Sequence, residues 1–353
     1  MDSRVALIGY GTGGSVFHAP LISTTAGMRL AAVVTGNPER QDAVRERHPD
    51  AKVLDSVDRL WEAAGSYDLA VITAPNRAHV PLARTALTAG LPVVLDKPVA
   101  ATAAEARSLA ALSAVRGLPV IPFHNRRWDG DFRTVRRLVA DGALGGVQRF
   151  ESRFERWRPE VKGSWKESTD PRDAGGILYD LGSHLIDQAV VLFGRPDRVY
   201  AEIDTRRPGA TAPDDVFVAL EHPGGERSSL WMSATAANLG PRFRVLGGAA
   251  AYTVGGLDGQ EDALRRGLTP KDPGWGIAAP AAYGTLGTPG AERPEPTEPG
   301  GYQDFYAAVA RTLRGDAPPP VSLADAIVGL EVIEAALQSS RDRTLTAPAT
   351  PAL

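Results

Sequence analysis

Three titratable side chains, Asp180, His184 and Asp187, recur at intervals of four and three residues in a segment that is otherwise apolar. In an α-helix these intervals place all three on one face, within about 60° of each other at roughly 100° per residue. A solvated helix face would be wider and would carry Lys and Glu. We therefore expect the stripe to face a cavity, where an imidazole beside a carboxylate could move protons at neutral pH.

The other side of this predicted helix, residues 175–193, is the apolar stripe of a packed helix. That stripe consists of Leu178, Leu181, Leu185, Ala189 and Leu192. Two other interpretations of the polar side stay open, because Asp180 could simply charge the first helical turn and His184 could be a satisfied structural histidine. A third is a metal site, but no other His or Cys has a ligand-like spacing, and a catalytic zinc usually takes three protein ligands. We predict that no metal is bound.

Composition narrows the function classes. A chain of 353 residues is long enough for two domains that each bury a core. A formal charge of −3 gives no reason to expect nucleic acid or a membrane surface as a partner, and the absence of Cys excludes disulfides, thiolate metal sites and cysteine nucleophiles. No leader precedes the first apolar run and no run is long enough to span a bilayer, so we expect a cytoplasmic protein.

A glycine-rich turn follows the first apolar run, residues 4–8, which is typical of a buried parallel strand. The turn fits the pattern G-x-G-x-x-G and consists of Gly9, Tyr10, Gly11, Thr12, Gly13 and Gly14. Its glycines permit a tight turn and close approach to a pyrophosphate, which the N–H groups at the start of the next helix would bind. The pattern alone is common, but its place after the first strand indicates a dinucleotide site.

Apolar runs and helical segments alternate through the first third of the chain. The runs cover residues 30–34, 69–73, 93–95 and 119–121, and the helices cover residues 39–47, 77–89 and 103–115. This alternation predicts an α/β fold with a doubly wound parallel sheet, an N-terminal Rossmann domain over residues 1–123. Ligands of such a sheet lie beyond the carboxyl ends of its strands, so the residues at those ends are site candidates.

The second strand ends without the acid that NAD enzymes usually place there. Residues 35–37 are Thr, Gly and Asn, so no carboxylate would bind the adenosine ribose hydroxyls or repel a phosphate on that ribose. Thr35, Asn37 and Arg40 could instead bind such a phosphate, which favours NADP over NAD. Arg40 is equally explained as an ordinary residue of a helix surface.

The third expected strand ends in Ala74, Pro75 and Asn76. We expect this backbone to lie along the nicotinamide half of the cofactor, as predicted for strand ends of this fold. His79, just inside the next helix, could join the cofactor site or be a simple first-turn residue.

The fourth expected strand ends in Asp96, Lys97 and Pro98, which we also expect beside the cofactor. A lysine that emerges from a buried strand toward a cofactor pocket could bind a substrate oxygen or polarise a carbonyl, with a pKa open to adjustment by burial. The alternative is a surface lysine between two elements.

The rest of the chain, residues 124–353, predicts an α+β substrate-binding and oligomerisation domain. Charged residues alternate with apolar or small ones over 149–156, the period of a strand with one buried face. Similar segments follow at 198–204, 215–221, 228–235, 243–246 and 250–254. Turns rather than helices join them, which predicts a large, mostly antiparallel open sheet. Helices are expected at 129–139, 302–313 and 323–338. They would cover one face and leave the other for a subunit partner.

Two stretches are too long to be simple connections. Residues 159–166 precede the predicted helix of His184 and could line or cover the pocket. Residues 257–300, rich in Gly and Pro, could form an interface arm, a substrate wall or a floppy surface insertion, and they leave no room for long regular elements. We expect the tail from Thr346 to be frayed.

The glycine turn, the two polar strand ends and the helix of Asp180 and His184, in that order, resemble the Gfo/Idh/MocA oxidoreductase family over nearly the whole chain. Segments 16–21, 124–129, 179–184 and 258–264 resemble its NADP-dependent scyllo-inositol dehydrogenase branch. The resemblance implies hydride transfer between NADP or NAD and a secondary alcohol or ketone of a polyol or sugar. It also implies a homo-oligomer formed through the C-terminal sheet.

Two positions depart from the family pattern. The usual Glu-Lys-Pro is here Asp-Lys-Pro at residues 96–98, a shorter acid that the site should tolerate. The relatives' Ser-Arg after the second strand is here Gly36 and Asn37, which removes the arginine expected to bind a ribose phosphate.

Lys97, Asp180 and His184 match the catalytic positions of the family. We expect His184 to be the acid/base, Lys97 to hold the reacting oxygen, and Asp180 to bind a substrate hydroxyl or to favour the imidazolium. Asn125 is expected to contact the cofactor and, with Trp165, to bind further substrate hydroxyls. Two rival functions fit the same residues or fold: a ketoreductase acting on a nucleotide-linked sugar, and a non-catalytic NAD(P)-binding regulator.

Overall fold

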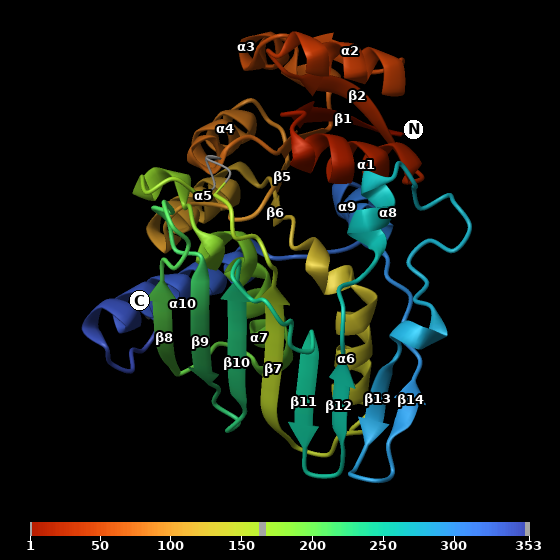
Figure 1. The fold of residues 1–353 in the computed structure, drawn as a ribbon. Helices are drawn as coiled ribbons and strands as arrows, with labels where there is room; N and C mark the ends of the chain where they lie inside the picture. Colours follow the sequence, from red (N-terminus) through yellow and green to blue (C-terminus); the bar gives the residue numbers. More distant parts are fainter. Residues whose placement is uncertain (1, 162–166, 350–353) are drawn as a thin grey trace.

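The computed structural model describes residues 2–161 and 167–349 and contains two sheets, the first above the second in Figure 1. The first sheet has six strands in the order β3-β2-β1-β4-β5-β6, and all neighbouring pairs are parallel. Its strands are β1 (Ser3–Ile8), β2 (Met28–Val34), β3 (Lys52–Leu54), β4 (Leu69–Ile72), β5 (Val93–Leu95) and β6 (Val120–Pro122). The strand order reverses between β1 and β4, where open α/β sheets bind their ligands.

Helices cover both faces of this sheet, so most residues of its central strands are apolar; β4, for example, is buried at every residue. The helices are α1 (Ala19–Thr24), α2 (Pro38–Arg47), α3 (Val57–Glu62), α4 (His79–Thr88) and α5 (Ala103–Arg116), and a π-helical turn (Gly13–His18) precedes α1. Local signals fix the ends of α5, because Thr102 and Glu105 cap each other's backbone N–H and Gly117 ends the helix at φ +63°. The predicted doubly wound α/β fold is confirmed.

Two short elements of this sheet were not predicted. The strand β3 has three residues and the helix α3 has six, too few for a periodic pattern to stand out. The strand that ends before Lys97 is therefore the fifth along the chain, not the fourth.

The second sheet has eight strands in the order β14-β13-β12-β11-β7-β10-β9-β8. They are β7 (Val147–Glu155), β8 (Arg198–Asp204), β9 (Asp215–Glu221), β10 (Arg227–Ser233), β11 (Phe243–Gly247), β12 (Ala251–Val254), β13 (Gly284–Gly287) and β14 (Arg293–Glu295). Every neighbouring pair is antiparallel except β7 and β10, which confirms the predicted mostly antiparallel sheet.

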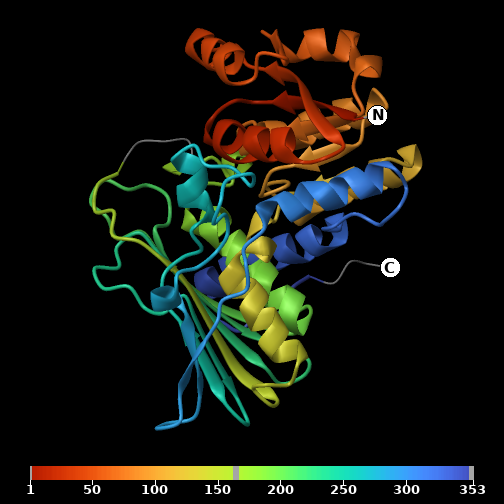
Figure 2. The same cartoon turned by 90° about the vertical axis from the view of Figure 1, so that its right-hand side faces the viewer.

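Helices cover one face of the second sheet. They are α6 (Gly130–Ala140), α7 (Ser183–Phe193) and α10 (Leu323–Asp342), and Figure 2 shows them on the same side of the sheet. Alternate side chains of each strand point toward these helices and are buried; in β9, for instance, these are Val216, Val218 and Leu220. The other face carries half-buried aromatic side chains, with Phe217 and Trp231 stacked 5.1 Å apart between ring centres.

Helix α9 (Tyr302–Leu313) belongs to the first sheet by its packing, although it comes late in the chain. Its residues Tyr302, Phe305 and Tyr306 are fully buried in one cluster with strand residues such as Leu7 and Ile121. The two cores are thus interlocked through the C-terminal segment. The domain boundary between residues 123 and 124 stays a prediction. Helix α9 follows that boundary in the sequence but packs against the first sheet.

Residues 257–300 contain only short regular elements, as expected, namely helix α8 (Gln260–Arg265) and the strands β13 and β14. Two other expectations for the second half of the chain need correction. The last helix continues to Asp342, and Thr346 forms a β-bridge with Val199 rather than a frayed end. Most of the loop 159–166 lies outside the described residues. Among residues 2–161 and 167–349, no helix combines the length and hydropathy needed to cross a bilayer.

Candidate active site

Lys97 meets Asp180 where the carboxyl end of β5 faces the second sheet. The Lys97 Nζ donates to Asp180 Oδ1 at 3.0 Å and also to the Asp180 backbone carbonyl. The side chains are 14% and 27% exposed, so the pair is shielded without being sealed from solvent. A charged amine held in this way can face an oxygen that becomes negative during a reaction.

Asp180 lies in a turn of π-helix, Leu178–Gly182, that leads directly into α7. The sequence predicted one regular α-helix over this stretch, so the wider turn is a difference from that prediction. Gly182 makes the close packing possible, because a Cβ there would lie 3.0 Å from Leu178 Cδ1 and 3.2 Å from Met232 Cε. Wider turns of this kind often occur at functional sites.

The predicted polar stripe divides into two environments. Asp180 reaches Lys97, whereas Asp187 accepts two hydrogen bonds from Arg127, at 2.9 and 2.6 Å. The carboxylate of Asp187 is buried in this bidentate ion pair. Burial raises the pKa of Asp187, but the nearby His124 and the Arg127 guanidinium outweigh burial and lower it. Asp187 therefore has a structural contact that the sequence did not predict.

His184 is 6% exposed, and its Nδ1 has no hydrogen-bond partner among the described residues. Its ring faces the edge of the His124 ring, with centres 6.4 Å apart. Burial, with the positive charges of Lys97 and Arg126, lowers the pKa of His184 well below 6.5, and Asp180 opposes this only weakly. Asp180 does act in the expected direction, toward the imidazolium, but burial and the nearby cations outweigh it and the net pKa shift favours the neutral imidazole.

The glycine turn has the tight geometry that its sequence predicted. Gly9 has φ +98°, and a Cβ on Gly14 would lie 2.2 Å from the Gly9 carbonyl oxygen. A Cβ on Gly13 would lie 2.9 Å from Asp96 Oδ2, so the carboxylate that precedes Lys97 packs against the turn. Gly9 and Gly14 therefore allow close packing within the turn, whereas a Cβ on Gly11 would have only an Arg40 nitrogen within 4 Å, so the backbone at Gly11 is open to a pyrophosphate.

The three residues at the end of β2 that were predicted to bind a ribose phosphate differ in their burial and in their hydrogen bonds. Asn37 is the N-cap of α2, with its Oδ1 accepting the Arg40 N–H at 2.9 Å, and Thr35 is buried. The Arg40 guanidinium is exposed and lies 3.9 Å from the position of a Cβ on Gly11. It has no ion pair within the described part of the chain, so it can reach a ligand phosphate at the turn.

His79 and Asn76 connect backbone segments. The two ring nitrogens of His79 lie 2.8 Å from the carbonyl oxygens of Pro98 and Ala74. Asn76 Nδ2 donates to the Asp173 carbonyl at 2.8 Å, which ties the end of β4 to the segment before α7. The polar atoms of the His79 ring are thus already occupied, and this side chain positions the two strand ends instead of reaching the cofactor. Pro75 begins the turn that carries Asn76.

Residues 124–127 bring a buried polar segment into the same region. Asn125 is 4% exposed and makes no side-chain hydrogen bond within the described ranges, so its amide is available to a ligand. Arg126 is buried and donates to Glu261 at 2.5 Å and to the Tyr302 hydroxyl at 3.1 Å. Sequence reasoning did not single out Arg126 or Glu261, because nothing local marks a partner 135 positions away. Trp165 lies outside the described residues.

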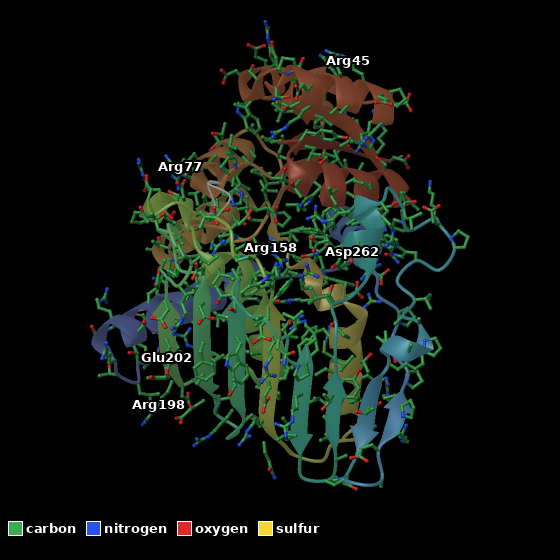
Figure 3. All side chains as sticks on the ribbon, in the orientation of Figure 1. Arg45, Arg77, Arg158, Arg198, Glu202 and Asp262 are labelled. Atoms are coloured by element: carbon green, nitrogen blue, oxygen red, sulfur yellow. The ribbon has the colours of Figure 1, made fainter. Side chains whose placement is uncertain are left out.

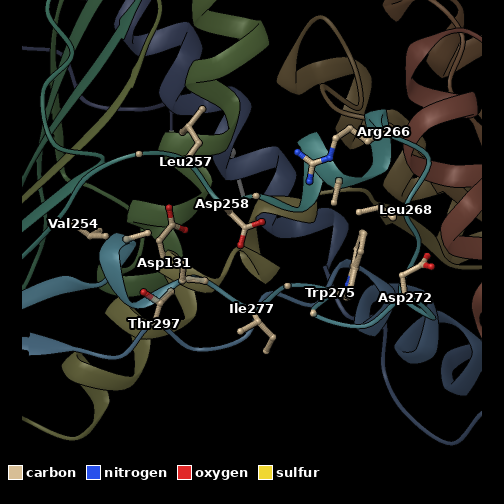
Figure 4. Close-up of a pocket in the computed structure, with 18 of the residues that line it drawn as sticks. Asp131, Val254, Leu257, Asp258, Arg266, Leu268, Asp272, Trp275, Ile277 and Thr297 are labelled. Carbon is tan, nitrogen blue, oxygen red and sulfur yellow. The ribbon is translucent and has the colours of Figure 1, made fainter.

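A cavity of about 340 Å³ lies beside this site, not at it (Figure 4). Its wall includes Leu257, Trp275 and Ile277, so the Gly- and Pro-rich stretch encloses a space instead of forming a floppy insertion. Asp131 also lines it, and burial raises the pKa of that carboxyl to about 6. Within residues 2–161 and 167–349, no three His, Asp or Glu side chains converge to hold a metal ion.

Two family models match the chain. The model described as the oxidoreductase family's NAD-binding Rossmann fold matches residues 3–124, and the model of its C-terminal alpha/beta domain matches residues 136–348. Together they span most of the chain, with the Lys97 strand end in the first and the His184 helix in the second.

Several known proteins are similar over nearly their full length. The chain is 34% identical to the scyllo-inositol 2-dehydrogenase (NADP(+)) IolW of Bacillus subtilis, covering 96% of this chain and 94% of that protein. It is 40% identical to the uncharacterized oxidoreductase YdgJ of Escherichia coli, covering 96% and 97%. The solved structure of yvaA from Bacillus subtilis superposes with a TM-score of 0.92 at 33% identity, covering 98% of both chains.

Proposed function

Because this chain belongs to the Gfo/Idh/MocA oxidoreductase family, with its NAD-binding Rossmann fold, we propose that it oxidises a secondary alcohol of an inositol-like polyol or sugar, or reduces the matching ketone. The observation that carries the proposal is the contact of Lys97 with Asp180, together with His184, whose buried Nδ1 has no hydrogen-bond partner among the described residues. The similarity to an inositol dehydrogenase supports the substrate class. When bound, the nicotinamide dinucleotide supplies the hydride acceptor or donor.

Each of the three side chains has a role in this reaction. The neutral imidazole of His184 takes the proton of the substrate hydroxyl during oxidation, and returns it during reduction. The Lys97 amine faces the same oxygen and stabilises the negative charge that develops on it. Asp180 keeps the amine charged and oriented, and it can accept a hydrogen bond from a neighbouring hydroxyl. Asn125 offers a further amide to cofactor or substrate.

The cofactor would lie along the glycine turn, with its adenosine end toward Arg40. The open backbone at Gly11 fits a pyrophosphate, and the guanidinium of Arg40, which has no ion pair among the described residues, fits a ribose phosphate, so we propose NADP as the preferred form. The relative IolW, by its name NADP-dependent, supports this choice.

We further propose a cytoplasmic homo-oligomer. The open face of the second sheet carries the Phe217–Trp231 stack, and Arg153 lies over the Trp231 ring at 4.0 Å. Aromatic and arginine side chains are enriched at protein interfaces, so this face is suited to a second copy. Light scattering of the purified protein would test it.

The experiment that tests the proposed function follows nicotinamide absorbance with NADP and NAD over a panel of inositols, aldoses and keto-sugars. We expect turnover of at least one compound, abolished in Lys97→Met. A protein that binds NADP by fluorescence titration but turns over none of them would favour the non-catalytic regulator.

A further inference from the structure

The end of β7 brings Arg156 next to the candidate active site. Its backbone N–H donates to the Ser233 carbonyl at 2.8 Å, so it continues the ladder between β7 and β10. The residue before Ser233, Met232, packs against Gly182 in the π-helical turn that carries Asp180. Arg156 therefore stands one strand away from that turn.

The Arg156 guanidinium is partly buried and lies over the Phe154 ring, 4.8 Å from its centre. The guanidinium of Arg126 lies over the same ring at 4.9 Å and is paired with Glu261. Arg156 has no such partner: no carboxylate oxygen of the described residues lies within 4.0 Å of it. The remaining residues, 1, 162–166 and 350–353, contain no Asp or Glu in the sequence.

The positive charge of Arg156 has no direct ion pair among the described residues to compensate it. Burial and the neighbouring charges of Arg158 and Arg126 lower the pKa of Arg156, while Asp180 and Glu261 act on it from beyond ion-pair distance. The structure pairs its other buried arginines, for example Arg242 with Asp131 at 3.7 Å. Partial burial of an unpaired charge is costly, and a bound anion would remove that cost.

Arg158 adds a second cation at the same place. It follows Arg156 by two positions, and alternate residues of an extended strand point to the same side. Its backbone N–H donates to the Ala234 carbonyl at 2.8 Å, so the extended pairing continues this far. Arg158 is exposed, and Figure 3 labels it near the upper ends of the strands of the second sheet. It likewise has no carboxylate partner within the described ranges.

We propose that Arg156, assisted by Arg158, selects a substrate that carries an anionic group, a carboxylate or a phosphate, on its polyol or sugar ring. The inference rests on the proposed function and specifies its substrate class. A guanidinium binds either anion through two parallel hydrogen bonds, which fixes orientation as well as charge. The anionic group would bind at Arg156 while the reacting hydroxyl faces Lys97 and His184.

The test compares matched neutral and anionic compounds in steady-state turnover with NADP. The pairs are D-glucose with D-glucuronate and D-glucose 6-phosphate, and myo-inositol with its monophosphate. We expect an anionic member to have a kcat/KM at least about 10-fold above its neutral partner. Arg156→Ala should lower that value by about 10- to 100-fold, the range of one charge-assisted contact, and change the neutral compound less than about 3-fold.

Two further variants separate binding from folding. Arg156→Lys keeps a charge and should restore part of the anion preference, whereas Arg198→Ala, an exposed arginine at the far end of β8 (Figure 3), should leave turnover unchanged. Thermal unfolding of each variant checks that the fold is intact. A larger effect on glucuronate than on the phosphate assigns a sugar acid, and the reverse assigns a sugar phosphate or a nucleotide-linked sugar.

A second readout keeps this inference distinct from the proposed function. D-gluconate and inorganic phosphate are titrated calorimetrically into the NADPH-loaded protein and into Arg156→Ala. If no compound is turned over but an anion binds and Arg156→Ala abolishes that binding, the proposed function fails and the anion site stands. If neutral polyols are used as well as anionic ones, and Arg156→Ala alters neither turnover nor binding, the inference is overturned while the oxidoreductase function stands. The absence of both turnover and anion binding overturns both.

Discussion

The two sides of the candidate site differ in how far their polar groups are satisfied within the protein. On the Rossmann side, His79 and Asn76 are hydrogen-bonded to backbone carbonyls, which fixes the strand ends. On the other side, the Nδ1 atoms of His124 and His184 have no hydrogen-bond partner among the described residues, and no carboxylate oxygen of those residues lies within 4.0 Å of the Arg156 guanidinium.

This difference indicates a division of labour. A dinucleotide is bound largely by backbone and helix ends, so its cradle can be completed by folding alone. A substrate must be distinguished by side chains, and groups left unsatisfied in the free protein are the ones that gain most from a ligand. The predictions that follow address this comparison, from the largest expected effect to the smallest.

The strongest test removes the imidazole on the unsatisfied side. His184→Ala should lower kcat by ~10²–10⁴, the usual contribution of a general acid/base, while NADP binding stays within about 3-fold of wild type. Steady-state turnover together with fluorescence titration of NADP measures both quantities. Wild-type turnover in this variant would show that His184, despite its Nδ1 without a hydrogen-bond partner among the described residues, has a packing role and no catalytic one.

Asp187, on the same helix, should behave as a structural residue. Asp187→Ala leaves Arg127 buried without its bidentate partner, which should reduce the free energy of unfolding by about 3–5 kcal/mol, measured by urea denaturation. Asp325 bonds the same arginine but is more exposed, so Asp325→Ala should cost about 1 kcal/mol or less. Equal losses in the two variants would contradict the assignment.

On the cofactor side, the exposed guanidinium of Arg40 has no ion pair among the described residues, and we expect it to set cofactor preference. Arg40→Ala should lower kcat/KM for NADP by about 10- to 100-fold, because the ribose phosphate loses its charged partner. The kcat/KM for NAD should stay unchanged, because NAD has no such phosphate. Arg45→Ala is the matched control, since Arg45 lies on the same helix and pairs with Asp42 (Figure 3). A parallel loss for both cofactors would point to the glycine turn itself.

The smallest effect concerns pH. Because burial and nearby cations hold the pKa of His184 below its ordinary value of 6.5, the neutral base persists as the pH falls through that value. The acid limb of kcat/KM for alcohol oxidation should therefore have its midpoint below pH 6.5. A midpoint at or above 6.5 would mean that Asp180 raises the pKa more than burial lowers it.

Local patterns in the sequence were sufficient for much of this molecule. The glycine turn, the strand-helix alternation and the alternating strand at 149–156 predicted both sheets, and the family resemblance is confirmed. Short elements such as β3 and α8 escaped detection because three to six residues do not establish a period. The roles of the predicted site residues stay predictions that the variants above can test.

The sequence by itself determined most of the elements and predicted which of their residues carry chemistry, because turn geometry and hydrophobic periodicity act over a few positions. Only the tertiary structure decided their environments. It paired Asp187 with Arg127, 60 positions away, and Arg126 with Glu261, 135 positions away, and it left Arg156 with no carboxylate oxygen of the described residues within 4.0 Å. Such pairings depend on where distant segments pack, and burial rather than residue type then sets the charge of each group.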